Sequence, residues 1–144
     1  MRSTTSQPDA FHAVLTFVII LEALTFFFFG FLHSGVRLSL GFAVLQEPRI
    51  IGAIIVESFC GLLLTGSAFA VATRKSWSWT ASVIAHTISI GGVLLGMTAL
   101  ALGAGPRTEL NDIYHRTILI ILVVMLIYLF TPSGKRALGH TQRP

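Results

Sequence analysis

The sequence is poor in charged residues, which make up 11% of its 144 residues, whereas an ordinary soluble domain carries about a quarter. Hydrophobic residues make up 53% of the chain. Such a composition leaves too few polar groups to cover a water-facing surface, and too much apolar surface for a disordered chain. The shortage of charge therefore excludes a soluble globular protein and an intrinsically disordered one.

Cysteine is equally scarce, because Cys60 is the only one. A single cysteine excludes a disulfide framework and any CxxC metal or redox motif. The Glu-x-x-His pattern of di-metal helix bundles is also missing. The residues three positions after Glu22 and Glu57 are Thr25 and Cys60 rather than histidines.

Four long apolar stretches are what the sequence does contain, over residues 11–32, 50–72, 77–102 and 113–130. About 20 apolar residues in a helix, each rising 1.5 Å, cross the hydrocarbon core of a bilayer. Barrel strands would instead be short segments of alternating hydrophobicity. The sequence predicts an all-α integral membrane four-helix bundle that forms a single domain over residues 1–144.

Lysine and arginine predict the orientation of this bundle, because basic residues near span ends favour the cytoplasm. With four spans, both termini and the 73–76 turn share one side, and we expect that side to be cytoplasmic in a bacterial inner membrane. The net charge of +4 then reflects topology, and we expect no nucleic-acid partner. The cytoplasmic side would carry Arg2, Arg74, Lys75, Lys135, Arg136 and Arg143, and the other side Arg37, Arg49, Arg107 and Arg116, offset by Glu47, Glu109 and Asp112.

Five ionisable residues fall within the spans or at their outer ends. Glu22 and His86 lie near the middle of the first and third spans, and Glu57 lies two turns into the second. His33 and His115 lie near the outer ends of the first and fourth. Intramembrane ionisable residues are functional candidates. We predict a Glu22–Glu57–His86 polar core that opens outward past the other two histidines, with its cofactor (metal, haem, quinone or none) left open.

The connection between the first two spans is unusually apolar for a loop. Residues 36–45 alternate apolar side chains with Arg37 and Ser39. This pattern predicts either a lid over the polar core or an interfacial segment that contacts lipid or a neighbouring protein. At the start of the fourth span, Thr108 or Asn111 is expected to cap the helix.

Three functions are compatible with these features. The leading interpretation is a non-enzymatic accessory subunit of a larger membrane complex or a homo-oligomer, since the chain has no soluble domain and no complete catalytic motif. The alternative is a redox, quinone-binding or lipid-binding membrane protein that uses the Glu/His cluster. A third interpretation follows from the segment Ile20-Leu21-Glu22-Ala23, which places an acid in the first span. With this acid, its four spans and its size, the chain resembles the small multidrug resistance exporters. The resemblance implies a proton-coupled transporter that acts as a dimer.

Overall fold

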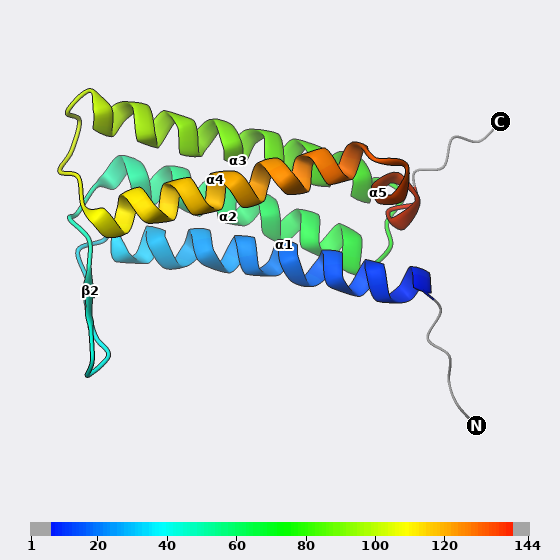
Figure 1. Ribbon diagram of the computed structural model, residues 1–144, viewed down its shortest axis with the longest axis horizontal. Helices are drawn as coiled ribbons and strands as arrows, with labels where there is room; N and C mark the ends of the chain where they lie inside the picture. Colours follow the sequence, from blue (N-terminus) through cyan, green and yellow to red (C-terminus); the bar gives the residue numbers. More distant parts are fainter. Residues whose placement is uncertain (1–6, 140–144) are drawn as a thin grey trace.

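The computed structural model describes residues 7–139, where four long helices lie side by side in antiparallel order (Figure 1). The predicted all-α fold is confirmed. Arg2 and Arg143, which entered the orientation argument, lie outside the described residues. The elements are α1 (Gln7–Leu32), β1 (Arg37–Ser39), β2 (Val44–Gln46), α2 (Ile51–Ala72), α3 (Ser78–Ala101), α4 (Glu109–Phe130) and α5 (Pro132–Ala137).

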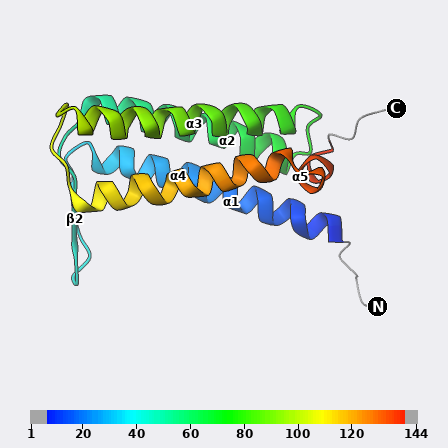
Figure 2. The same cartoon turned by 45° about the horizontal axis from the view of Figure 1, so that its top comes forward.

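The bundle has two distinct ends, which both views show (Figures 1 and 2). At the hairpin end, α1 and α3 finish, α2 and α4 begin, and the β1–β2 hairpin projects. At the α5 end, α2 turns into α3 and the short α5 folds against the bundle. There Trp79 donates a hydrogen bond of 2.9 Å to the carbonyl oxygen of Leu129, and Lys135 lies 5.9 Å from the Trp79 ring centroid.

Local sequence explains where these helices stop and start. Gly35 follows α1 with a φ of +88°, which favours glycine, and its N–H bonds the Leu32 carbonyl. Thr108 is the cap residue of α4, because its side chain accepts a hydrogen bond from the Asn111 N–H at 3.1 Å. The capping prediction is therefore confirmed for Thr108, and the helix begins at Glu109, four residues before the predicted apolar span.

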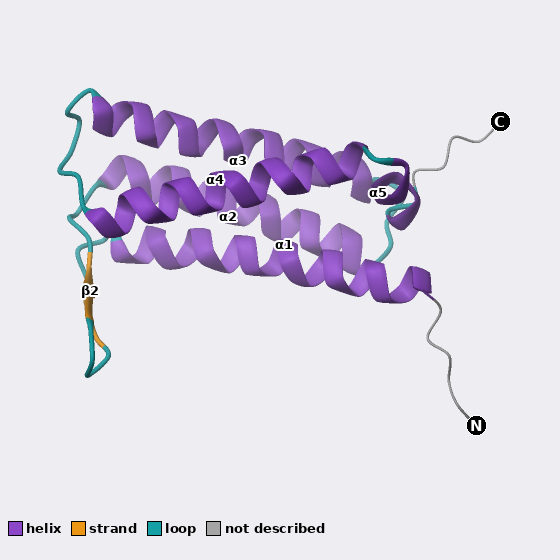
Figure 3. Ribbon diagram, viewed as in Figure 1, coloured by secondary structure: helices purple, strands orange, loops and turns teal. Residues whose placement is uncertain are grey.

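The connection between α1 and α2 forms a two-stranded antiparallel hairpin, in which Leu38 pairs with Leu45 (Figure 3). It runs crosswise to the helices and points away from the bundle in both views (Figures 1 and 2). Leu38 and Leu45 nevertheless pack against the core of the bundle, and the direction of the hairpin favours the interfacial interpretation over the lid. Phe42 at the turn is 89% exposed, so the interfacial interpretation remains.

Unlike a soluble bundle, these helices expose many large apolar side chains, and they bury a set of polar side chains beside the apolar core. Large apolar side chains such as Phe17, Leu62 and Ile120 are exposed along the helices. The interior contains, beside an apolar core, the buried polar residues Glu22, His33, Glu47, Glu57, Ser67, Ser78, Ser82, His86, Ser89, Asn111 and His115. Within the described chain, four helices are long and apolar enough to cross a membrane.

Candidate functional site

The deeper of two buried histidine–glutamate pairs joins α1 to α3. His86 Nε2 lies 3.0 Å from Glu22 Oε2, and both side chains are almost completely buried. His86 Nδ1 donates to the Ser82 carbonyl oxygen at 2.7 Å, because that oxygen can only accept. A neutral His86 would therefore accept from a protonated Glu22, whereas a charged His86 would donate to the carboxylate. In either state one proton is shared between Nε2 and Oε2.

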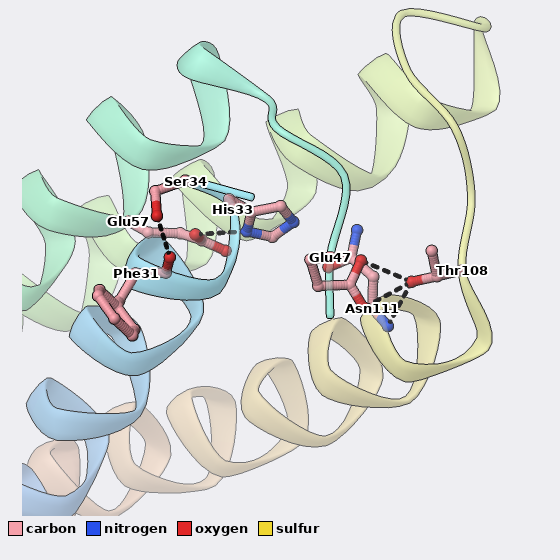
Figure 4. Close-up of polar contacts among 7 residues, drawn as sticks. All are labelled: Phe31, His33, Ser34, Glu47, Glu57, Thr108 and Asn111. Carbon is pink, nitrogen blue, oxygen red and sulfur yellow. Dashed lines mark hydrogen bonds and ion pairs between the residues drawn. The ribbon is translucent and has the colours of Figure 1, made fainter. Parts of the chain in front are cut away.

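The second pair lies at the hairpin end and joins the residue after α1 to α2. His33 Nδ1 lies 2.8 Å from Glu57 Oε2 (Figure 4). Burial lowers the pKa of His33, but the hydrogen bond and charge of Glu57, with the charge of Glu47, outweigh burial and raise that pKa above its ordinary value. The His33 carbonyl oxygen also accepts from the Ile50 N–H at 3.1 Å, so the backbone holds this histidine at the start of α2.

A cavity of about 400 Å³ lies beside the outer pair. Its wall is mostly apolar, and its polar residues come from α2, from α4 and from the residue that follows α1. It is lined by Phe26, His33, Ile50, Gly52, Ala53, Val56, Glu57, Gly92, Val93, Leu95, Gly96, Ala99, Leu100, Ala104, Asn111, Tyr114 and His115.

Five residues that line this cavity carry a buried polar atom without a hydrogen-bond partner in the described part of the chain. A buried polar group left without a partner costs about 1–3 kcal/mol, so native proteins contain few of them. Of the seven such atoms in the described residues, Glu22 Oε1 and Ser89 Oγ lie elsewhere and five belong to residues of this lining. The atoms are His33 Nε2, Glu57 Oε1, Asn111 Oδ1, Tyr114 Oη and His115 Nδ1.

Aromatic packing holds the Tyr114 ring in place. It stacks on Phe29 with ring centroids 3.6 Å apart and meets Phe26 edge-on at 6.3 Å. His115 follows directly, with its ring centroid 5.1 Å from that of Tyr114. Packing against two phenylalanines of α1 therefore fixes the position of the tyrosine ring and of its hydroxyl group.

Two glycines of α3 provide the space opposite these rings. A Cβ at Gly96 would lie 3.4 Å from His115 Nε2, and a Cβ at Gly92 would lie 3.0 Å from Cys60 Sγ and from Val56 Cγ1. Gly91, on the same helix, has no neighbour within 4 Å of such a Cβ. Glycines 92 and 96 therefore allow close helix packing and leave room in the cavity, as small residues do in apolar bundles.

A buried carboxylate ties the hairpin to the same end of α4. Glu47 is 1% exposed, and its oxygens accept from the Thr108 hydroxyl at 2.7 and 2.8 Å (Figure 4). The far edge of the His33 ring points toward the side on which Glu47, Thr108 and Asn111 lie (Figure 4). The structure thus places the loop between α1 and α2 against the start of α4, next to the cavity.

The predicted polar core is divided in the structure. Glu22 and His86 are brought together, as are Glu57 and His33, and His115 lines the same cavity as the second pair. Within residues 7–139 no hydrogen bond joins Glu57 to Glu22 or His86. One continuous core is therefore replaced by a deep pair and an outer cavity.

Two cavity residues, Asn111 and Tyr114, were not among the predicted site residues. Asn111 lies four residues before His115, and Tyr114 lies four residues before Ile118, so these residues share one side of α4. That shared side was the signal in the sequence that could have identified Asn111 and Tyr114. Glu109, Asp112 and His115 follow one another at a spacing of three in the first turns of α4, and Asp112 accepts a hydrogen bond from Arg107 at 2.8 Å. The described chain contains no group of three His, Cys, Asp or Glu residues placed to hold a metal ion.

Comparison with models of known protein families, with curated proteins and with solved structures found no match to this chain.

Proposed function

We propose that the chain is an integral membrane protein whose cavity at the hairpin end binds a small, neutral, amphipathic molecule. The observation that carries this proposal is the set of five unpartnered buried polar atoms around one otherwise apolar cavity. Ligand sites typically combine an apolar wall with a few convergent polar groups. The proposal corresponds to the quinone-binding or lipid-binding interpretation of the sequence rather than to its leading one.

The exposed apolar surface supports insertion in a membrane. In water the large side chains along α1, α2 and α4 would be exposed at a free-energy cost, whereas in lipid they face a matching solvent. A helix of 22 residues, the length of α2 and α4, extends about 33 Å, close to the hydrocarbon thickness of about 30 Å. The crosswise hairpin would then lie along the membrane surface (Figure 1).

The distribution of lysine and arginine supports, by the positive-inside rule, an orientation with the α5 end in the cytoplasm of a bacterium. The Arg74-Lys75 turn and Lys135-Arg136 lie at that end. In a Cys60→Ser background, a membrane-impermeant maleimide applied to spheroplasts should label Ser39→Cys in the hairpin and spare Lys75→Cys. The reverse labelling would overturn the orientation and leave the ligand proposal intact.

The lining of the cavity favours a neutral ligand. Glu57 and His33 neutralise each other as a pair, and no lysine or arginine belongs to the described lining. An anionic head would have no cation to bind and would lie near Glu47 and Glu57. A neutral head with hydrogen-bonding groups, joined to an apolar remainder, matches both the polar atoms and the apolar wall.

Native mass spectrometry of protein extracted gently from its host membrane tests the proposal. The wild-type chain should retain an additional small mass, and Gly96→Leu should lose it because the new side chain enters the cavity. Gly91→Leu, the same substitution on an open face of α3, should retain it. Equal retention by both variants would place the bound molecule elsewhere, and no bound mass in any of the three proteins would contradict the proposal.

The accessory-subunit interpretation stays a second candidate, favoured by one observation. Phe42, between β1 and β2, is 89% exposed, so a neighbouring membrane protein could pack against it. A partner retained by the wild-type protein and lost in Phe42→Ser would support this role, whereas a variant that retains the same partner would argue against it. Ligand binding and membership of a complex are compatible.

A further inference from the structure

We infer that the ligand of the cavity carries a flat ring with oxygen substituents, the chemistry of a quinone and its quinol. This inference rests on the proposed function and names the class of molecule that the cavity takes. Three features of the cavity support it: the kinds of unpartnered atoms, the aromatic residues in the wall, and the cavity volume.

The unpartnered atoms include both donors and acceptors. The Tyr114 hydroxyl can donate, and Glu57 Oε1 and Asn111 Oδ1 accept unless protonated. The free ring nitrogens of His33 and His115 do either, according to tautomer and protonation. A quinone accepts hydrogen bonds and its quinol can also donate them, so the two forms of one molecule together engage both kinds of atom in this set.

The outer pair can adapt to either form. With Nδ1 directed at Glu57, a neutral His33 that donates from Nδ1 leaves Nε2 to accept from a quinol hydroxyl. Once His33 is protonated, the same nitrogen donates to a quinone carbonyl. The ring edge with Nε2 is the one that points away from Glu57 (Figure 4). One histidine can therefore bind both forms without a change of rotamer.

Shape favours a ring over an aliphatic chain or a phospholipid head. Tyr114, Phe26 and His115 contribute aromatic surfaces, and aromatic groups pack on one another by offset or edge-on contacts. About 400 Å³ accommodates a substituted ring but falls short of a whole phospholipid. The exposed apolar exterior of the bundle is suited to an attached chain.

Binding of decyl-substituted benzoquinone to the purified protein tests this inference. Decanol and decanoic acid, at the same concentration and in the same detergent, control for partition of the ten-carbon chain into micelles. We expect saturable binding of the quinone alone, seen as a concentration-dependent rise in the thermal unfolding midpoint.

Tyr114→Phe removes the hydroxyl and keeps the stacked ring, so it should weaken quinone binding about tenfold, the value of one hydrogen bond of about 1.4 kcal/mol. Tyr128→Phe, near the other end of α4, is the matched control and should leave the affinity unchanged. An unfolding midpoint of unliganded Tyr114→Phe within the range of the wild-type protein would separate a lost contact from a damaged fold.

Other outcomes separate the inference from the function on which it rests. If decanol binds as well as the quinone and Tyr114→Phe has no effect, the quinone inference is overturned while the proposal of a neutral amphipathic ligand survives. Binding of decanoic acid, which is an anion at neutral pH, would overturn both. If tetraphenylphosphonium binds and the quinone does not, the cavity is a cation site and the transporter interpretation gains support. If no probe binds and no molecule co-purifies, both proposals fail.

Discussion

Each histidine–glutamate pair leaves one carboxylate oxygen, Glu22 Oε1 or Glu57 Oε1, without a hydrogen-bond partner in the described residues, and the pairs differ in their histidines. In the deep pair both His86 nitrogens have partners, whereas in the outer pair His33 Nε2 has none in the described chain. The deep pair thus resembles a structural contact between α1 and α3. The outer pair presents a free nitrogen to a cavity, which is why the proposed function is assigned to it.

Removing one member of the deep pair should destabilise the protein more than removing both. His86→Leu leaves the Glu22 carboxyl buried without its partner, which costs about 3–5 kcal/mol in comparable pairs, whereas replacing both members by apolar residues is often neutral. We expect Glu22→Leu/His86→Leu to unfold at a higher temperature than His86→Leu in the same detergent.

If the double variant is instead as unstable as the single one, an unpaired buried charge is not the source of the loss. The loss of stability would then come from poorer packing, since leucine differs in shape from both glutamate and histidine. Glu22→Gln, which keeps the shape and removes the negative charge, distinguishes the two explanations.

Residue pairing was only partly predictable from the sequence. Depth along a helix places Glu22 level with His86, because a rise of about 1.5 Å per residue fixes depth in each span. Depth does not reveal that Glu57 bonds His33, since that contact depends on how the loop returns the chain to Ile50. Glu47 gave no signal at all, because a loop acid before a proline is ordinarily solvated.

At the scale of elements, a single hydroxyl connects the hairpin, the cavity end and α4. Thr108 donates to Glu47 and accepts from the Asn111 N–H, so it caps the helix and partners a buried carboxylate at once. The long apolar helices could be predicted from hydropathy, but the hairpin could not, since three-residue strands carry too little periodicity to recognise.

Thr108→Val should therefore cost about 2–4 kcal/mol, the sum of a lost cap and an unpartnered buried carboxylate. Hydrogen exchange at the first amides of α4 should accelerate. Thr98→Val is the matched control, because the Thr98 hydroxyl is exposed and donates only to the Leu94 carbonyl oxygen of its own helix. Equal losses in both variants would show that the contact with Glu47 contributes nothing.

At the scale of the whole molecule, the apolar exterior makes different predictions for two environments. Leu62 lies midway along α2 and is 62% exposed. In a soluble bundle, Leu62→Lys would change the free energy of unfolding by no more than about 0.5 kcal/mol. In a membrane, lysine at the centre of a span costs about 2.5–3.5 kcal/mol on insertion scales.

We expect Leu62→Lys to reduce the amount of chain that stays in membranes after alkaline carbonate extraction, and to lower its unfolding midpoint in liposomes. Leu102→Lys is the matched control, because this leucine is 82% exposed and lies just beyond the end of α3, where a lysine reaches the headgroups. Unchanged behaviour of both variants would mean that the exposed face of α2 does not contact lipid, and the cavity would then open toward water or a partner chain. A loss confined to Leu62→Lys would place the middle of α2 in the hydrocarbon core, and with it the apolar surroundings from which a ligand could enter.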